Sequence, residues 1–309
     1  MILMKKWLIK EEEASFAAKY PGARSFEEHI KKGIIILDKP RGPTSHIVDS
    51  YIKQIMGIEK VSHGGTLDPP VSGVMVIPLL EATKLMPILL SSKKEYVGVV
   101  YLHKPVPEDK ILKACKDLEG KITQLPPKRS AVARKERERE IYYLEVLEVV
   151  GQYVLIKVGC EAGTYIRRLA EQIGWELDVG SHLVELRRTK SGGFNEDDII
   201  TLQDLSDAIV SSDENIIREV VHPLELVANE MNCVIVGEGA IDNICNGSPL
   251  YVGGVVKVTA DIKVGDIVGM FSVAGEMIGF GIAKMTSKEM IKEKKGIAVK
   301  TDRILRVNK

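Results

Sequence analysis

The segment "HGGTLDPPVSG", from His63 to Gly73, places a single carboxylate, that of Asp68, among three glycines and two prolines. The next residues, "VMVIPLL", have the continuous apolar character of a buried β-strand. Glycine permits irregular backbone and proline restricts it, so the segment predicts a fixed loop that holds Asp68 at the start of a strand. Taken alone, the segment is explained more simply by an Asp-Pro turn. Residues elsewhere in the chain have to decide between the two interpretations.

The composition limits the class of protein. The chain has 309 residues, of which 45% are hydrophobic and 28% charged, as is typical of a globular protein with one large and one small domain. The 43 Lys and Arg residues balance 43 Asp and Glu residues, so any nucleic-acid site must come from local basic clusters. No apolar run is long enough for a membrane span, and the N-terminus lacks a signal-peptide core. We therefore expect a cytoplasmic protein with no membrane partner.

The cysteines and histidines show no ligand pattern. No Cys-x-x-Cys pair and no His-Glu-x-x-His spacing occurs, so we expect neither a metal site nor a disulfide framework. The cysteines are expected as small buried side chains at positions Cys115, Cys160, Cys233 and Cys245. Three histidines are expected at the surface or in loops, namely His29, His103 and His222.

A strand, a turn and a helix are predicted before the opening loop. "GIIILDKPRG" indicates a buried strand from Gly33 to Asp38, which Lys39-Pro40 ends. The helix that follows begins near Thr44 and stops at Gly57. After Asp68 the sequence predicts a strand over 74–79, a helix broken near Pro87, a strand over 94–102, a helix over 107–118, a hairpin over 141–163, a helix over 164–174 and a strand over 181–192. This irregular alternation predicts an α+β fold with a mixed sheet.

The pattern changes after about residue 213. The tail from about 231 consists of short β segments between glycine turns, with one helix at "SKEMIKEKK", and predicts a small β-barrel or sandwich. We expect three parts: an N-terminal segment 1–32, a large domain 33–228 and a small domain 229–309.

Three further segments carry candidate site residues. "KEYVG" places Tyr96 on a strand, "CEAGTYIRRL" places Tyr165 and Arg167 at a helix start, and "HLVELRRTKSG" contains Leu186. Together with "ILDKPRGPTSH" and the opening loop, these five motifs occur in an order that resembles the pseudouridine synthases of the bacterial tRNA T-loop family. The resemblance covers roughly residues 33–225. Each of these side chains, taken alone, is explained by ordinary core packing. Only the order of the five motifs along the sequence favours a catalytic site.

Other segments narrow the resemblance. "QLPPKRSAVARKERER", "SHLVELRRTKSGGF" and "VVHPLEL" are similar to the archaeal and eukaryotic branch, the dyskerin-like catalytic subunits of H/ACA ribonucleoproteins. The tail resembles a PUA domain, a small RNA-binding β-barrel. The resemblance implies a largely antiparallel catalytic sheet and an N-terminal segment that packs on the PUA domain. Eukaryotic members carry lysine-rich extensions that this sequence lacks, which favours an archaeal-type protein.

The resemblance also implies an activity. Members of this family isomerise uridine in RNA without a cofactor, and Asp68 matches their essential aspartate. Its carboxylate either adds covalently to the nucleoside or removes a proton from the sugar, and both alternatives stay open. Arg167 is expected to pair with Asp68 and keep it ionised.

The other motif residues are expected around the base. Tyr96 would stack on a uracil turned out of its helix, Leu186 would pack on its other side, and Tyr165 would line the same pocket. His63 matches a family histidine that lies near the target nucleotide.

A basic group of residues is expected to contact RNA. The candidates are Lys128, Arg129, Arg134, Lys135, Arg187 and Arg188. Glutamates interrupt the basic run within 128–139. The alternative to RNA contact is therefore that this run is a charged segment exposed to solvent.

The resemblance implies RNA and protein partners. The expected RNAs are the tRNA T-loop (uridine 55), an H/ACA guide RNA and an rRNA substrate. The expected proteins are a small zinc-ribbon-like subunit, a small β-barrel subunit and a kink-turn-binding subunit. Guide-dependent and guide-independent activity need the same pocket, so the sequence does not separate them. A non-catalytic RNA-binding scaffold is the alternative function. No second framed acid lies near a motif, which excludes a glycosidase with paired carboxylates.

Overall fold

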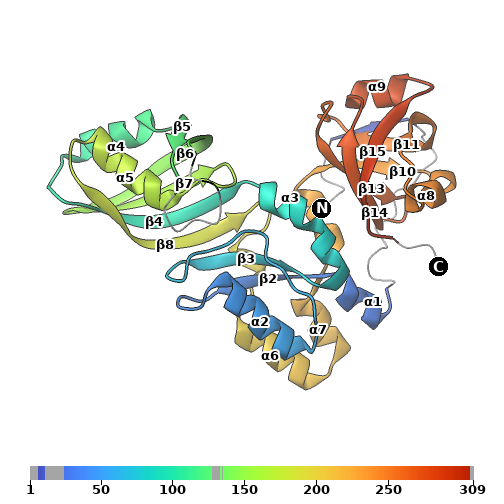
Figure 1. The fold of residues 1–309 in the computed structure, drawn as a ribbon, viewed down its shortest axis with the longest axis horizontal. Helices are drawn as coiled ribbons and strands as arrows, with labels where there is room; N and C mark the ends of the chain where they lie inside the picture. The colour runs from blue at the N-terminus through green and yellow to red at the C-terminus, as the bar shows by residue number, and fades with distance from the viewer. Residues whose placement is uncertain (1–5, 11–23, 127–132, 134, 307–309) are drawn as a thin grey trace.

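The computed structural model describes residues 6–10, 24–126, 133 and 135–306 (Figure 1). Within these residues the chain forms an eight-stranded and a seven-stranded sheet with helices packed against them. The seven-stranded sheet lies at one end of an elongated molecule (Figure 1). The predicted α+β fold with largely antiparallel sheets is confirmed.

The eight-stranded sheet consists of two halves. Its strand order is β5-β6-β7-β4-β8-β3-β2-β9, and the bounds are β2 Gly33–Lys39, β3 Ser72–Pro78, β4 Lys94–Leu102, β5 Gly120–Gln124, β6 Arg137–Val150, β7 Tyr153–Cys160, β8 Ser181–Ser191 and β9 His222–Pro223. All neighbours are antiparallel except β3 and β8, which run parallel and pair only at Ser72 with Arg187 and Gly73 with Arg188. The short β3–β8 contact therefore joins two largely separate halves.

The helices pack against both sheets, and α8 and α9 lie against the seven-stranded sheet. The α-helices of the described residues are α1 Phe26–Lys31, α2 Ser45–Met56, α3 Met86–Ser91, α4 Glu108–Asp117, α5 Ile166–Glu176, α6 Leu202–Ser211, α7 Glu214–Val220, α8 Glu238–Cys245 and α9 Ser287–Lys292. Short 3-10 turns are η2 Leu80–Leu85, η3 Glu196–Asp198, η4 Leu224–Asn229 and η5 Val252–Gly254.

The β2–β3 half is buried on both faces. Alternate residues of a strand point to opposite sides, so Ile35 and Leu37 join a core with α2, α6 and α7, whereas Ile34 and Ile36 face the other way. That second core continues without a break into residues of the seven-stranded sheet, among them Phe271. Shared apolar packing therefore joins the two sheets.

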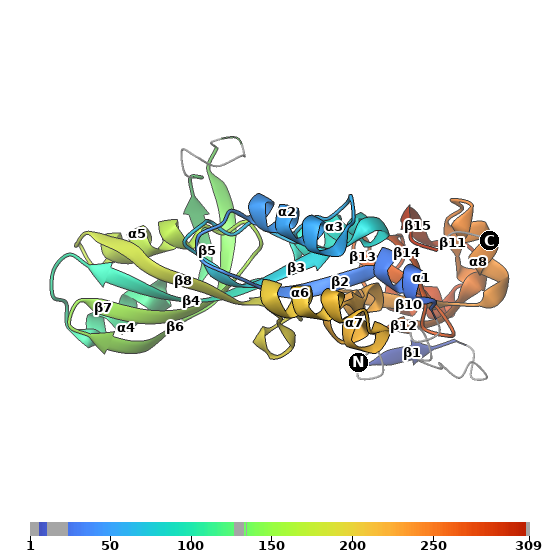
Figure 2. The same cartoon turned by 90° about the horizontal axis from the view of Figure 1, so that it is seen from below.

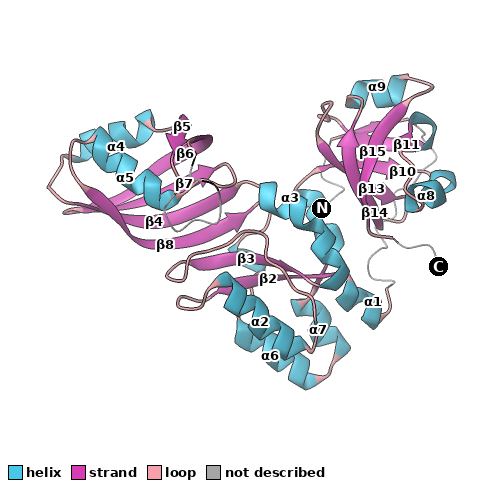
Figure 3. Ribbon diagram, in the orientation of Figure 1, coloured by secondary structure: helices cyan, strands magenta, loops and turns pink. Residues whose placement is uncertain are grey.

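The other half carries α4 and α5 on one face (Figure 3). Their apolar residues pack on β4, β6, β7 and β8 around a core that includes Val100 and Ile156. From below, the β5 and β6 ends project from the body of the sheet (Figure 2). The β6–β7 hairpin turns at Gly151, which has a φ of 61°.

The seven-stranded sheet follows the order β1-β12-β10-β13-β14-β15-β11 and has a barrel-like form. Its strands are β1 Trp7–Ile9, β10 Asn232–Val236, β11 Leu250–Tyr251, β12 Val255–Thr259, β13 Ile267–Ser272, β14 Met277–Ala283 and β15 Ile297–Ile304. The N-terminal strand β1 pairs with β12. Arg24, from the same N-terminal segment, forms a buried ion pair with Glu225. The domain boundaries at 32/33 and 228/229 stay a prediction.

Local predictions agree with the structure where the sequence signal is strong. Helix α2 has Thr44 as its N-cap and Gly57 in the left-handed conformation at its C-terminus, and β4 covers the predicted 94–102. The surface position predicted for His29 is wrong, because the ring is 4% exposed and Nε2 lies 2.6 Å from the carbonyl oxygen of Val221. No helix of the described residues is long and apolar enough to cross a membrane.

Candidate functional site

The loop that carries Asp68 is fastened at several backbone positions. The amide of Gly64 donates to the carbonyl of Val76 over 2.8 Å, and that of Val71 donates to the carbonyl of Asp68 over 3.0 Å. Ser45, the first residue of α2, exchanges hydrogen bonds with the backbone of Leu67 at 2.9 and 3.1 Å. These contacts fix the backbone on both sides of the carboxylate.

Lys39 provides a second support. Its ammonium group is buried and donates to the carbonyl oxygens of Pro40 and Val71, both at 2.9 Å, and of Pro69 at 3.4 Å. Burial lowers the pKa of Lys39, the nearby Arg188 lowers it further, and Asp68 opposes both. The end of β2 therefore holds the prolines that follow Asp68.

The structure brings Asp68 and Arg167 together. Nη2 of Arg167, at the start of α5, donates a hydrogen bond to Oδ2 of Asp68. Both side chains are about half exposed, at 54% for Asp68 and 53% for Arg167. A carboxylate in this position is oriented by a guanidinium and still open to a ligand from solvent.

Tyr96 and Leu186 lie on adjacent strands, and Tyr96 is close enough to Asp68 for the two side chains to interact electrostatically. Strands β4 and β8 pair Tyr96 with Arg188 and Gly98 with Leu186. Tyr96 is buried, and burial raises the pKa of its hydroxyl, which lies beside the Arg188 guanidinium. Leu186 is half-buried and packs on the same core. A side chain at Gly98 would collide with Leu186, since its Cβ would lie 2.9 Å from Cδ1.

Tyr165 precedes α5 and is half-buried. Its amide donates to Oε1 of Gln124 over 2.9 Å. Gln124, the last residue of β5, was not predicted as part of the site. Its contact sets the start of the helix that carries Arg167.

Arg188 corrects the predicted set of RNA contacts. Its side chain is 1% exposed, and the guanidinium donates to the carbonyls of Val74 (2.7 Å) and Gly65 (3.1 Å). A group with these buried partners does not face a phosphate, so the prediction for Arg188 is wrong. Arg187, on the opposite face of the strand, is 35% exposed and pairs with Asp38 and Glu196.

The remaining basic candidates precede β6 in the sequence. Lys128, Arg129 and Arg134 fall outside the described residues. Lys135 is described and exposed, two residues before β6 begins. The RNA contacts proposed for this run stay a prediction.

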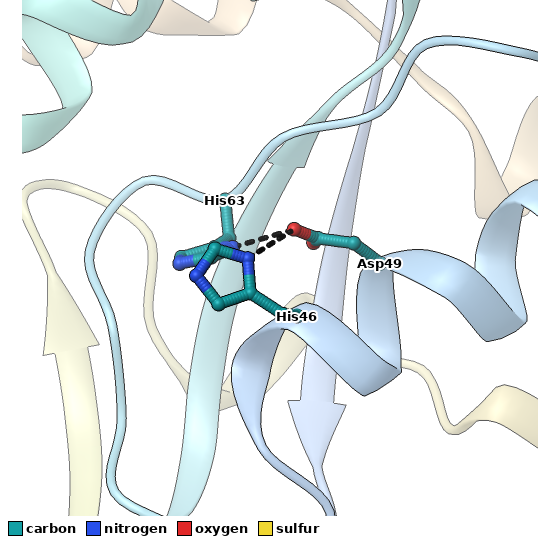
Figure 4. Close-up of side chains that lie close together, drawn as sticks. All are labelled: His46, Asp49 and His63. Atoms are coloured by element: carbon teal, nitrogen blue, oxygen red, sulfur yellow. Dashed lines mark hydrogen bonds and ion pairs between the residues drawn. The ribbon is translucent and has the colours of Figure 1, made fainter.

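His63 is turned inward in this structure. Its ring is 7% exposed, with Nδ1 lying 2.7 Å from Oδ2 of Asp49 and Nε2 lying 3.1 Å from Oγ1 of Thr66. His46, one turn before Asp49 on α2, lies next to this pair (Figure 4). The sequence analysis did not predict this cluster, although His46-x-x-Asp49 is the spacing that places two side chains on one helix face.

The arrangement provides one reactive group and apolar surroundings for it. It presents a rigid, accessible carboxylate beside a guanidinium, and an aromatic and an aliphatic side chain lie on neighbouring strands. Such a carboxylate can act as a nucleophile or as a base.

Family models match nearly the whole chain. The model described as TruB family pseudouridylate synthase (N terminal domain) matches residues 53–166. The tRNA pseudouridylate synthase B C-terminal domain matches residues 167–228, the PUA domain matches 232–305, and the DKCLD (NUC011) domain matches 9–48.

Relatives and solved structures agree with these matches. Proteins described as probable tRNA pseudouridine synthase B are 46% identical in Methanopyrus kandleri (92% of this chain, 86% of the relative) and 46% identical in Pyrococcus furiosus (96% and 90%). A chain of a Cbf5-Nop10-Gar1 complex superposes with a TM-score of 0.93 at 45% identity, over 98% of this chain and 94% of that one. A chain of an H/ACA RNP bound to a substrate RNA containing 2′-deoxyuridine superposes with a TM-score of 0.89 at 43% identity, over 98% and 95%.

Proposed function

The chain belongs to the TruB family of pseudouridylate synthases, and on this premise we propose that it converts uridine to pseudouridine in RNA. The reaction breaks the N1–C1′ bond of the nucleoside, forms a C5–C1′ bond, releases the C5 proton and adds a proton at N1. The reaction involves no net oxidation or reduction and consumes no second reactant.

The pairing of Asp68 with Arg167 in a fastened, half-exposed loop is the observation that carries this proposal. In the proposed mechanism the carboxylate of Asp68 attacks the nucleoside or takes a proton from its sugar. Arg167 orients that carboxylate through a charge-assisted hydrogen bond from Nη2 to Oδ2. Tyr96, Tyr165 and Leu186 would enclose a uracil that has left its stack. His63, whose ring points inward onto Asp49 in this structure, would turn outward to approach the nucleotide from the RNA side.

We propose two settings for the reaction. In one, the chain acts on the T-loop uridine of tRNA, as the names of its relatives suggest. In the other, it acts with an H/ACA guide RNA on rRNA, beside the small zinc-ribbon-like, β-barrel and kink-turn-binding subunits. The similarity to a chain from a Cbf5-Nop10-Gar1 complex supports the second setting. A cytoplasmic location is part of the same proposal.

Release of tritium from RNA labelled at uridine C5 tests both settings. The purified chain is assayed on a T-loop RNA alone, and on a guided substrate together with guide RNA and partner subunits. Release in the first assay supports the tRNA activity, and release only in the second supports the guided activity. No release in either assay, from protein that still binds RNA, would instead favour a non-catalytic scaffold.

A further inference from the structure

Three potential metal ligands converge beside the catalytic loop. They are His46 and Asp49 of α2 and His63 of the loop, and their ligand atoms lie within 4.8 Å of one another (Figure 4). Oδ2 of Asp49 lies 2.7 Å from Nδ1 of His63 and 4.0 Å from Nδ1 of His46. From this geometry we propose that the three side chains bind a divalent transition metal of the zinc class.

The residue types fit that class of metal. Zinc is bound by imidazole nitrogen and carboxylate oxygen at about 2.0–2.2 Å, and three protein ligands with one water form a common tetrahedral site. Ligand atoms at such distances from one metal lie about 3.3 Å apart. The Asp49–His63 distance must therefore open slightly, and His46 must move closer. His46 is free to do so, because its side chain is 85% exposed and lies on the surface of α2.

A hydrogen bond between Asp49 and His63 does not account for the whole cluster. Asp49 is 8% exposed, and its second oxygen, Oδ1, is buried with no hydrogen-bond partner among the described residues. A buried carboxylate oxygen without a donor is costly. The negative charge of the Asp49 carboxylate is spread over both of its oxygens. A cation bound between Oδ2 and the two imidazoles would therefore also offset the charge on Oδ1.

The remaining nitrogen of His63 is also suitably arranged. Nε2 lies 3.1 Å from the hydroxyl of Thr66. Metal-bound histidines commonly use the second ring nitrogen in a hydrogen bond that fixes the ring. Thr66 therefore supplies the contact expected behind a ligating imidazole.

The site would link two elements. His46 and Asp49 belong to α2, whereas His63 precedes Asp68 by five residues in the loop. A bound metal would hold His63 in its inward position, away from the nucleotide, and would further fix the loop. The inference goes beyond the proposed function, because binding is measured without RNA and without turnover.

Cobalt(II) is the probe for the test, with the full chain freed of metal beforehand. Wild-type protein is expected to bind one Co²⁺ per chain, with the visible absorption of a four-coordinate nitrogen and oxygen site. His46→Ala is expected to lower the affinity at least about tenfold. This substitution lies on an exposed helix surface, so the fold should be retained. Zn²⁺ should displace Co²⁺ and raise the unfolding temperature of the wild type more than that of His46→Ala.

The pair His103 and His182 provides a matched control. Their ring nitrogens lie 2.9 Å apart at another exposed place, and His182→Ala is expected to leave Co²⁺ binding unchanged. Three results would overturn the proposal: no binding by the wild type, equal binding by His46→Ala, or a thiolate-to-cobalt absorption band that places the metal on a cysteine.

Discussion

The guanidinium of Arg188 donates a hydrogen bond to the carbonyl oxygen of Gly65 over 3.1 Å, although 123 residues separate the two. The backbone of Arg188 also packs against Gly73, where a Cβ would lie 2.2 Å from the Arg188 carbonyl oxygen. The loop that carries Asp68 is therefore held at both ends by one residue of β8. Its glycines and prolines permit the loop conformation, and this buried cation keeps it in place.

Replacing Arg188 with lysine should loosen the loop. Lysine lacks the planar fork with which Arg188 donates from Nε to Val74 and from Nη2 to Gly65. We therefore expect one of these carbonyls to lose its donor, and a buried acceptor without a donor costs about 1–3 kcal/mol. We expect that loss in the free energy of unfolding, measured by denaturant titration, and a fall in turnover with RNA affinity largely retained.

The control is Arg168→Lys, at a residue that pairs with Glu171 one turn along α5. It should change the stability by less than about 0.5 kcal/mol. If Arg188 contacts a phosphate instead, Arg188→Lys would keep the stability and alter the salt dependence of RNA binding.

Asp68→Asn should abolish turnover and spare the fold. The amide keeps the size of the side chain and loses its negative charge, so it can neither attack nor take a proton. We expect a loss of at least about 10²–10⁴-fold in tritium release. The half-exposed pair with Arg167 contributes at most about 1 kcal/mol, so denaturation and RNA binding should change little. Wild-type turnover in this variant would contradict the role proposed for Asp68.

Local signals were sufficient for much of the fold. The cap at Thr44, the left-handed Gly57 and the apolar run before Lys39 act within a few residues, and the elements they predict are present. Strand β5 was missed because five residues with one buried hydrophobic side chain, Ile122, owe their conformation to pairing with β6. Helix α6 was also missed, although Thr201 and Asp204 form a capping box at its start.

The candidate site was also predicted only where local sequence signals were sufficient. Asp68 and Arg167 stand in recognisable motifs, whereas Arg188 was grouped with Arg187 as one basic patch. Side chains alternate along a strand, so two adjacent arginines on β8 must point to opposite faces. Which of them enters the core depends on the packing of β3 and β4, which the local sequence does not show.

The buried ion pair of Arg24 and Glu225 should matter for stability. Their side chains are 1% and 6% exposed, and Oε1 of Glu225 also accepts from the amide of Met277 over 3.0 Å. Glu225→Gln would remove the carboxylate that pairs with the buried Arg24, and we expect this to cost up to about 3–5 kcal/mol. Denaturant titration measures this loss.

A surface pair serves as the comparison. Glu27→Gln removes the carboxylate that pairs with Lys31, which is exposed. It should leave the unfolding transition unchanged. An equally small effect of Glu225→Gln would show that the N-terminal segment does not depend on the buried pair.

The buried ammonium group of Lys94 should make stability depend on pH. Lys94 donates to the carbonyls of Leu89 and Ser92, and burial, reinforced by Arg188, lowers its pKa from 10.5 to about 7. Between those two values the unfolded chain holds a proton that the folded chain has released, so stability rises with pH in this window. Relative to Lys94→Met, the free energy of unfolding of the wild type should increase by up to about 1.4 kcal/mol per pH unit above pH 7. The control is Lys93→Met at the exposed neighbouring residue. Its free energy of unfolding should change with pH in the same way as that of the wild type. If the Lys94→Met curve also runs parallel, Lys94 keeps its proton in the folded protein, and its hydrogen bonds outweigh the cost of burying the charge.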